Sequence, residues 1–390
     1  MSRPVKRRHV FFLSGFDPKG ASYYHALYAA QAQMQGRVTG AAYTVSPRIK
    51  CSDGNSCWSV DSVSPQGSSH TTYEFVRWDD IVRSRWPRTG WGVLAGSLRA
   101  YISAIGAGRS LIKVWRVAPK TLFSLCYPAL VWLAAALMSI AVGVALAFAI
   151  DATIGRRNYW GAGIGMATAA AAWIGALRWE RRLHTTWLLR IYQFAADWAS
   201  GRIEELPQRL DQLFDRIAFQ LGQDDLDEVL LIGFSVGSML AVSAAARVKE
   251  TVPAGRLAKL SVLTLGHCIP LLGLMPRATK FRADLARMGG NPALNWLDFS
   301  STTDWGSFAL VDPVALCLRA TAGSMHGPAL ASPRFHTLFK PATYAQIRGD
   351  KRRMHLQYLM AAELPGPYDF FAVTAGPLRL ADRFNPAPTS

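Results

Sequence analysis

The strongest chemical signal in this 390-residue chain is Gly233-x-Ser235-x-Gly237, which stands between a short apolar run and a segment of small, helix-forming residues. Flanking glycines let a strand and a helix approach closely around a sharply turned serine, whose oxygen is then exposed. The turn also brings that oxygen near a helix N-terminus, where backbone N–H groups stabilise developing negative charge. The pattern therefore predicts Ser235 as a nucleophile; the alternative is an incidental serine in a strand–helix turn.

The surrounding pattern predicts the elements that must position this serine. An apolar strand from Glu228 to Ile232 precedes it, and a helix from Ser238 to Lys249 follows it. Helical spacing predicts two further helices, from Ala21 to Gln35 and from Ile203 to Leu221. The polar stretch Lys50 to His70 predicts a loop or hairpin. Runs of β-branched, aromatic and apolar residues predict strands, which are expected at Val10 to Leu13, Val38 to Val45, Thr72 to Trp78, Lys259 to Leu265 and Leu294 to Phe299. This order implies an α/β fold with a mostly parallel sheet flanked by helices.

With the motif in this context, the chain resembles the α/β-hydrolase superfamily, and its lipases and esterases in particular. The resemblance covers the segment from Glu228 onward and, more loosely, the first strand and its loop. It implies a nucleophile, an acid and a histidine in that chain order. It also implies two backbone N–H donors for an oxyanion, which fall here on Val236 and Phe16. Many family members carry His-Gly before the second donor, where this chain has Ser14-Gly15.

The resemblance places the acid after a late strand and the base further along the chain. Asp304 is the preferred acid because it lies beyond the expected strand Leu294 to Phe299, at the end where a triad acid belongs. Asp312, a turn residue before a proline, and Asp298, inside the strand, remain alternatives. His355 is the preferred base, set just before an expected C-terminal helix. The alternatives to it are His326 and His336.

The implied chemistry is acyl transfer through an acyl-enzyme. His355, held in the right tautomer by Asp304, would take the proton of Ser235, and water would release the acyl group. Such a reaction needs no metal and no organic cofactor. The expected substrate is an acyl ester or a lipid-like small molecule; a thioesterase or an acyltransferase would use the same residues.

Two uncharged runs predict a membrane hairpin inserted into this fold. Thr121 to Ile150 has 30 residues without a charge, and Asn158 to Leu177 has 20, rich in alanine and glycine. About 20 apolar residues span a bilayer, and small residues allow close helix packing there. The expected domains are an N-terminal part of the hydrolase-like fold at 1–120, the hairpin at 121–177 and a C-terminal part with the serine at 178–390. Two buried helices in a large soluble core are the alternative.

Basic flanks predict the orientation of the hairpin. Arg156 and Arg157 stand in the turn, whereas each outer flank carries four basic residues: Arg109, Lys113, Arg116 and Lys120 before the hairpin, and Arg178, Arg181, Arg182 and Arg190 after it. Because basic flanks stay in the cytoplasm, both globular halves should lie on that face, at the inner membrane if the chain is bacterial. Membrane lipids are therefore expected partners.

The overall composition agrees with a globular part joined to a few membrane segments. The formal net charge is +17 and the mean hydropathy is +0.11. The charge suits an anionic membrane surface, and without zinc-finger or RNP-like patterns we expect no nucleic-acid partner.

Of the five cysteines, Cys51 and Cys57 could pair, but two free thiols in a reducing compartment are expected. The oligomeric state stays open.

Two other classes of function compete with the hydrolase. A non-catalytic membrane scaffold on a hydrolase fold would leave Ser235 without a catalytic role. A small transporter component would need more than two apolar runs, and neither run carries a charged residue that could mark an ion or substrate path.

Overall fold

The chain builds one mixed nine-stranded sheet with helices on both faces. A computed structural model describes residues 4–86, 90–105, 108–154, 159–183, 185–290, 294–318 and 325–384. The strand order is β2-β4-β5-β1-β6-β7-β8-β9, with β3 also paired to β4. One half is parallel: β5 (Gly67–Phe75), β1 (Arg7–Leu13), β6 (Glu228–Phe234), β7 (Leu260–Leu265), β8 (Asn295–Phe299) and β9 (Ala329–Ala331). The other half is antiparallel: β2 (Ala42–Val45), β3 (Ile49–Lys50) and β4 (Ser56–Ser64) against β5. The predicted α/β class is confirmed.

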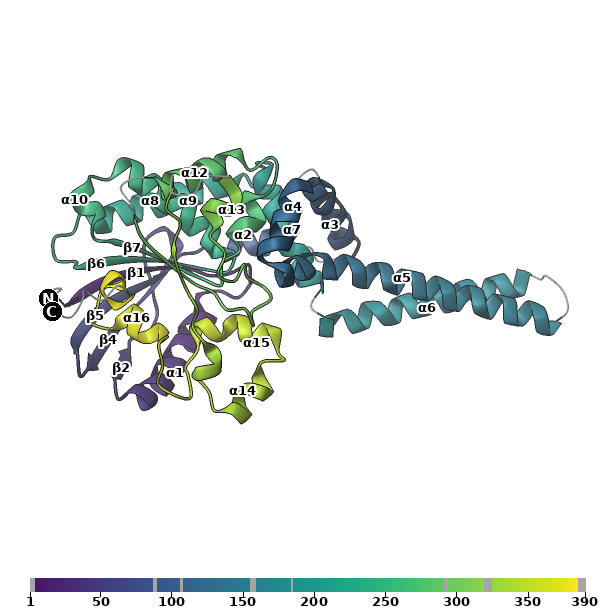
Figure 1. Cartoon of the computed structure of the whole chain (residues 1–390), viewed down its shortest axis with the longest axis horizontal. Coiled ribbons are helices and arrows are strands. Elements are labelled where there is room, and N and C mark those ends of the chain that lie inside the picture. The colour runs from purple at the N-terminus through teal and green to yellow at the C-terminus, as the bar shows by residue number, and fades with distance from the viewer. Residues whose placement is uncertain are drawn as a thin grey trace.

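Each face of the sheet carries its own apolar core. Every residue of β6 is buried, and its side chains alternate between the two cores. One core lies under α8 (Glu205–Leu221), α9 (Gly237–Thr251) and α12 (Thr279–Gly289). The other lies under α1 (Ala21–Thr39), α15 (Lys351–Leu356) and α16 (Phe370–Ala375). Figure 1 shows these two layers above and below the sheet. A strand that is covered on both faces has a continuous run of apolar residues, and for this reason β6 could be predicted from the sequence.

Several predicted element boundaries move. The helix predicted to end at Gln35 continues to Thr39, where Gly40 takes a left-handed conformation (φ 74°) and ends it. The strand predicted from Val38 therefore begins only at Ala42. The polar stretch predicted as a loop or hairpin contains β4 and the start of β5, which pair antiparallel across a tight turn.

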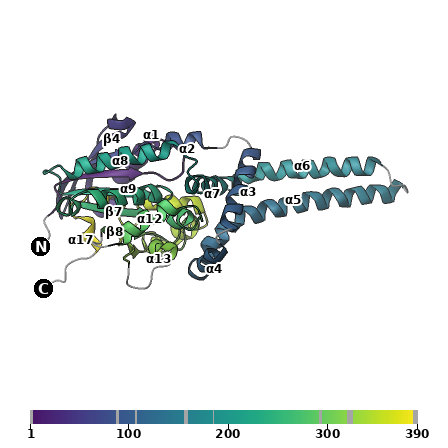
Figure 2. The same cartoon turned by 90° about the horizontal axis from the view of Figure 1, so that it is seen from above.

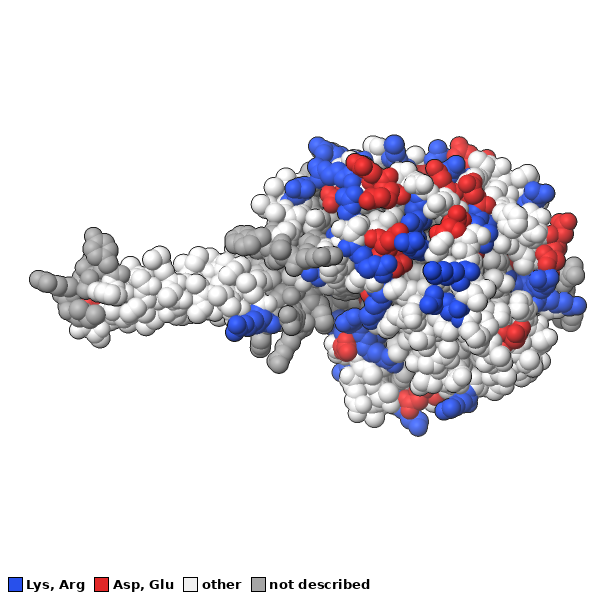
Figure 3. Space-filling model, turned by 180° about the vertical axis from the view of Figure 1, so that it is seen from behind, with Lys and Arg blue, Asp and Glu red and all other residues white. Residues whose placement is uncertain are grey.

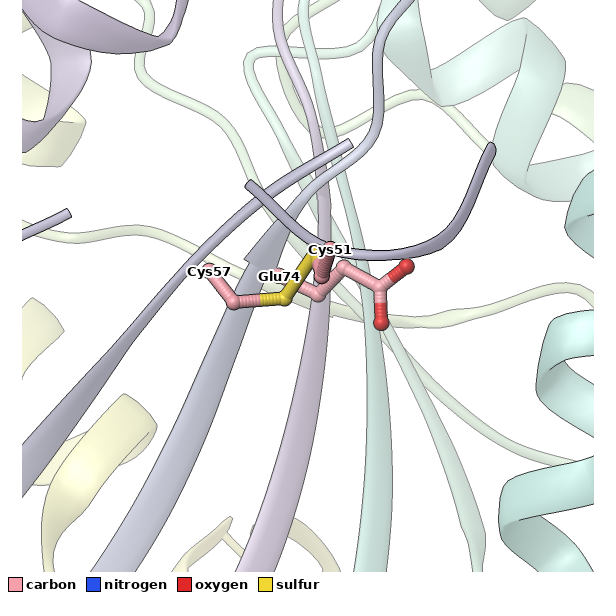
Figure 4. A group of neighbouring side chains, drawn as sticks. All are labelled: Cys51, Cys57 and Glu74. Carbon is pink, nitrogen blue, oxygen red and sulfur yellow. A yellow bond between two sulfur atoms is a disulfide. The ribbon is translucent and has the colours of Figure 1, made fainter. Parts of the chain in front are cut away.

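The expectation that Cys51 and Cys57 are free thiols is wrong. The two form a disulfide with a Cα–Cα distance of 5.9 Å, beside the buried carboxylate of Glu74 (Figure 4). The closed loop holds Asn55, whose side chain donates to Glu74. The bridge removes both sulfurs as metal ligands, although the three side chains lie close enough together to have formed a site.

A long helical hairpin projects from the globular body. It consists of α5 (Pro119–Ile154) and α6 (Tyr159–Leu183), which lie side by side in Figures 1 and 2. Both are long and apolar enough to cross a membrane, and only 11% of the apolar window in each is buried, whereas a soluble core helix would be mostly buried. Gly143 and Gly165 face one another so closely that a Cβ at either would meet the other's carbonyl oxygen. The small-residue packing predicted for the pair is therefore present. The predicted turn residues Arg156 and Arg157 lie outside the described residues.

Helices near the ends of the hairpin anchor its root to the globular part. They are α3 (Gly90–Ile105), α4 (Gly108–Val117) and α7 (Thr185–Ala199), none of which was predicted. Pro128 has no N–H, so the carbonyl of Ser124 loses its partner within α5. The hydroxyl of Tyr192 donates to that carbonyl at 2.9 Å, and Tyr101 donates to the carbonyl of Leu125 at 2.9 Å. The root is thus fixed by polar contacts as well as by apolar packing.

Candidate active site

Ser235 occupies a strained turn at the carboxyl end of β6. Its φ is 55°, in the left-handed region that side chains other than glycine rarely adopt, and the residue is 3% exposed. A hydrogen bond from its N–H to the carbonyl of Leu265, at 2.9 Å, fixes the turn to the neighbouring strand. A Cβ at Gly233 would meet the backbone of Ser238, and one at Gly237 would meet the carbonyl of Leu13. The two flanking glycines therefore allow the close approach on which this conformation depends.

Asp304 and His355 form a buried pair close to this turn. Nδ1 of His355 lies 2.9 Å and 3.0 Å from the two carboxylate oxygens of Asp304. Because a carboxylate only accepts, Nδ1 is the donor and carries the proton. The residues are 2% and 5% exposed, and the N–H of Gly306 also donates to the acid at 2.9 Å. The arrangement leaves Nε2 of His355 as the nitrogen with a free lone pair.

Ser235 and His355 line the same cavity, of about 260 Å³. Nε2 of His355 is buried and has no hydrogen-bond partner among the described residues. The ring is held between Phe234, with a centroid distance of 5.0 Å, and Trp187, at 6.0 Å. An unpartnered ring nitrogen in a cavity shared with a strained serine is suited to accept a proton there.

Two backbone N–H groups, on residues near Ser235, make no hydrogen bond within the described part of the chain. Among the residues that the structure describes, none accepts a hydrogen bond from the N–H of Val236 or of Phe16. Gly15 is packed so closely that a Cβ there would lie 3.1 Å from Cβ of Ser235. The ring of Phe16 is buried against Trp86 with a centroid distance of 5.6 Å, which holds its backbone in place. Both N–H groups were predicted from the sequence as oxyanion donors, and that role stays a prediction.

The alternative acids have other roles. Asp298 is buried inside β8 and accepts from Thr264 and Ser300, each at 2.7 Å. Burial raises the pKa of the Asp298 carboxyl. Asp312 accepts from the N–H groups of Val314 and Ala315 at the start of α13 (Pro313–Leu318). Both contacts are structural.

The alternative histidines lie away from the cavity. His326 and His336 are exposed, and neither lines it. One detail of the preferred base needs correction: His355 lies within α15 rather than before a helix. This helix has only six residues, half of them charged, so its sequence shows no helical period of apolar residues.

Several residues around the site were not predicted from the sequence. Trp187 from α7 and Arg352 from α15 line the cavity, and the Sγ atom of Cys268 lies 3.7 Å from Oγ of Ser235. Burial raises the pKa of the Cys268 thiol to about 12, so the sulfur stays protonated at neutral pH. A neutral thiol packs as a small apolar group and does not compete with the serine as a nucleophile.

Comparisons with protein-family models, with curated proteins and with solved structures found no match for this chain.

Proposed function

We propose that the chain is a membrane-anchored serine hydrolase that cleaves an ester through an acyl-enzyme on Ser235. The observation that carries the proposal is the histidine: Nδ1 of His355 is held by Asp304, while Nε2 is unpartnered in the cavity that Ser235 lines. A positioned base beside a strained serine is the arrangement that activates a hydroxyl. An α/β-hydrolase-like arrangement of the fold is part of the same proposal.

The reaction follows from these positions. Nε2 of His355 accepts the proton of Ser235 as Oγ attacks the substrate carbonyl carbon. The oxygen that becomes negative is stabilised by the N–H groups of Val236 and Phe16. Nε2 then returns its proton to the leaving alcohol, or thiol in a thioester, as the C–O or C–S bond breaks. Water attacks the acyl-serine in the same way and releases the acid.

The membrane part of the proposal rests on the projecting hairpin. In Figure 3 its visible surface is mostly uncharged, whereas the globular body carries many basic and acidic groups. Residues around the hairpin's root also expose apolar side chains to solvent: Leu98, Ile102, Ile112, Trp115 and Val117. Exposed apolar side chains at this level suit the interface of a bilayer. The cytoplasmic side is the side that the basic flanks predict.

The first test is covalent labelling. A fluorophosphonate probe should modify Ser235 in the detergent-solubilised full chain, as identified by peptide mass spectrometry. Labelling should vanish in Ser235→Ala and persist in Ser64→Ala, a control at the half-buried end of β4. A folded wild-type chain that stays unlabelled would refute the proposal and favour a non-catalytic scaffold.

A further inference from the structure

His355 also lines a second, larger cavity. Its volume is about 520 Å³, within the usual range of small-molecule sites. Trp187, Arg352 and His355 line both this cavity and the one that contains Ser235. A third, small space of about 30 Å³ is lined by Ser235 and by Ser124 of the hairpin root. The larger cavity therefore lies next to the proposed reacting groups.

The hairpin itself forms one wall of this larger cavity. Phe123 and Tyr127 of α5 line it, together with Trp305 and the start of α15. The hydroxyl of Thr121 donates to the carbonyl of Ser307 at 2.9 Å, and the ring of Phe123 packs edge-on against Trp305 at 6.1 Å. The hairpin root thus contacts the loop that carries Asp304. It is part of the site's wall as well as an anchor.

The length of α5 places this wall at the bilayer surface. The apolar part of the helix runs from Pro119 to Thr153, 35 residues. At about 1.5 Å per residue it is about 50 Å long, whereas the hydrocarbon core is about 30 Å thick. The first turns of α5, which line the cavity, contact the globular part, so we expect the excess length to fall at this end and these turns to lie in the headgroup layer. A molecule whose tail is in the bilayer reaches the cavity from there.

The cavity has an aromatic wall and a basic rim. Nζ of Lys351 lies 4.4 Å from the ring centroid of Trp305, and Arg352 is exposed, with no ion pair among the described residues. Asp350 is the one carboxylate among the described residues that line this cavity, and it accepts from the N–H of Arg353 and caps α15. An aromatic wall suits a hydrocarbon chain, and a basic rim suits a negative group.

We propose that this second cavity binds the hydrocarbon chain of an amphiphilic ester drawn from the membrane, and that Lys351 and Arg352 bind a negatively charged group of the same molecule. The inference rests on the proposed reaction at Ser235. It assigns a substrate class, an anionic lipid-like ester, and it makes the hairpin root part of the recognition site.

Chain-length selectivity tests the apolar part. Labelling rates of Ser235 are measured for an ethyl and a dodecyl fluorophosphonate on the full chain in detergent. Gly349 lines the cavity, and a Cβ there meets no atom within 4 Å, so Gly349→Trp adds an indole without a backbone clash. Phe123→Ala removes part of the wall. Each variant should lower the dodecyl-to-ethyl rate ratio by about tenfold.

The matched control is Gly255→Trp, at a glycine in α10 (Ala254–Leu257) that also has open space and lines none of these cavities. Its ratio should equal that of the wild type. A ratio within about twofold of the wild type in either cavity variant would overturn the inference. The ethyl probe separates the two ideas: no labelling of the wild type refutes the hydrolase itself, whereas ethyl labelling with an unchanged ratio refutes only the chain site.

Charge selectivity tests the rim. A dodecyl probe that carries a carboxylate at its polar end is compared with a neutral one. The wild type should favour the anionic probe by about tenfold, and the double variant Lys351→Gln with Arg352→Gln should lose that preference. Equal rates for the two probes in the wild type would overturn the assignment of an anionic substrate.

Discussion

Replacing Asp304 by asparagine should stop the proposed chemistry while it leaves the shape of the site intact. Oδ1 of Asp304 accepts from the N–H of Gly306 at 2.9 Å, so the amide oxygen of an asparagine must take that position. The NH₂ group then takes the position of Oδ2, 2.9 Å from Nδ1 of His355. The amide oxygen, at the position of Oδ1, still lies 3.0 Å from Nδ1, but the closer NH₂ group would then meet the Nδ1 proton donor to donor. We expect this repulsion to make Nδ1 the acceptor and to move the ring proton to Nε2. In that tautomer Nε2 carries the proton and has no lone pair to offer in the cavity that Ser235 lines.

The magnitude follows from that change of tautomer. In a serine protease, the corresponding change lowers turnover by about 10⁴-fold, which equals about 5.5 kcal/mol in the barrier. The burial of the Asp304–His355 pair favours an effect of this size, because no water can replace the lost acceptor. We expect Asp304→Asn to lower the second-order rate of fluorophosphonate labelling by about 10³- to 10⁴-fold.

The matched control is Asp312→Asn, the other candidate acid in the sequence. Among the described residues, the Asp312 side chain accepts only from backbone N–H groups at the start of α13, so an asparagine oxygen can replace it and labelling should stay unchanged. A labelling rate for Asp304→Asn within about threefold of the wild type would refute the role given to this carboxylate. A large loss in Asp312→Asn alone would transfer that role to Asp312.

Three further predictions concern stability, reactivity and topology. Although burial alone raises the pKa of Glu74, hydrogen bonds from its neighbours lower this pKa from 4.5 to about 2, so the stability that the carboxylate contributes is present above pH 4.5 and is lost as the pH falls towards 2. Glu74→Gln should therefore lower the free energy of unfolding by about 3 kcal/mol at pH 7, measured as a lower melting temperature. A difference in melting temperature between the variant and the wild type that does not shrink towards pH 2 would contradict this. With a pKa of about 12, Cys268 is ionised in roughly one molecule in ten thousand at pH 8, so iodoacetamide should neither modify it nor slow labelling of Ser235, as peptide mass spectrometry would reveal. Topology can be tested with single-cysteine reporters in a Cys126→Ser background. An impermeant maleimide should modify Thr153→Cys, near the hairpin turn, in intact cells, but should modify Met34→Cys, in α1 of the globular part, only after lysis. The opposite pattern would place the globular part outside the cell.

The disulfide gives the topology experiment additional weight. Bridges such as Cys51–Cys57 persist in oxidising compartments, whereas the basic flanks predict the cytoplasmic side. A globular part found outside would agree with the disulfide and contradict the flanks. A cytoplasmic position predicts that the bridge is reduced in cells, which alkylation before and after reduction measures.

Local pattern was enough for the elements whose signal lies in consecutive residues. The strand before Ser235 is buried on both faces and therefore reads as a continuous apolar run, and the glycines beside it mark the turn. The hairpin was visible because lipid requires long uncharged runs. In contrast, α3, α4 and α7 were not predicted, since their segments mix aromatic, basic and small residues without a clear period. Helices of this kind are specified by what they pack against.

The sequence by itself located the strand–serine–helix turn at Ser235, the α/β class and the apolar hairpin, because each depends on neighbours within a few residues. Only the tertiary structure decided which acid meets which histidine: Asp304 and His355 are 51 residues apart, and their contact depends on where β8 ends and how α15 returns over the sheet. It also decided that Cys51 and Cys57 form a bridge and that the hairpin root forms a wall beside His355. Contacts of this kind join distant segments, and spacing along the chain does not encode the direction in which a side chain points.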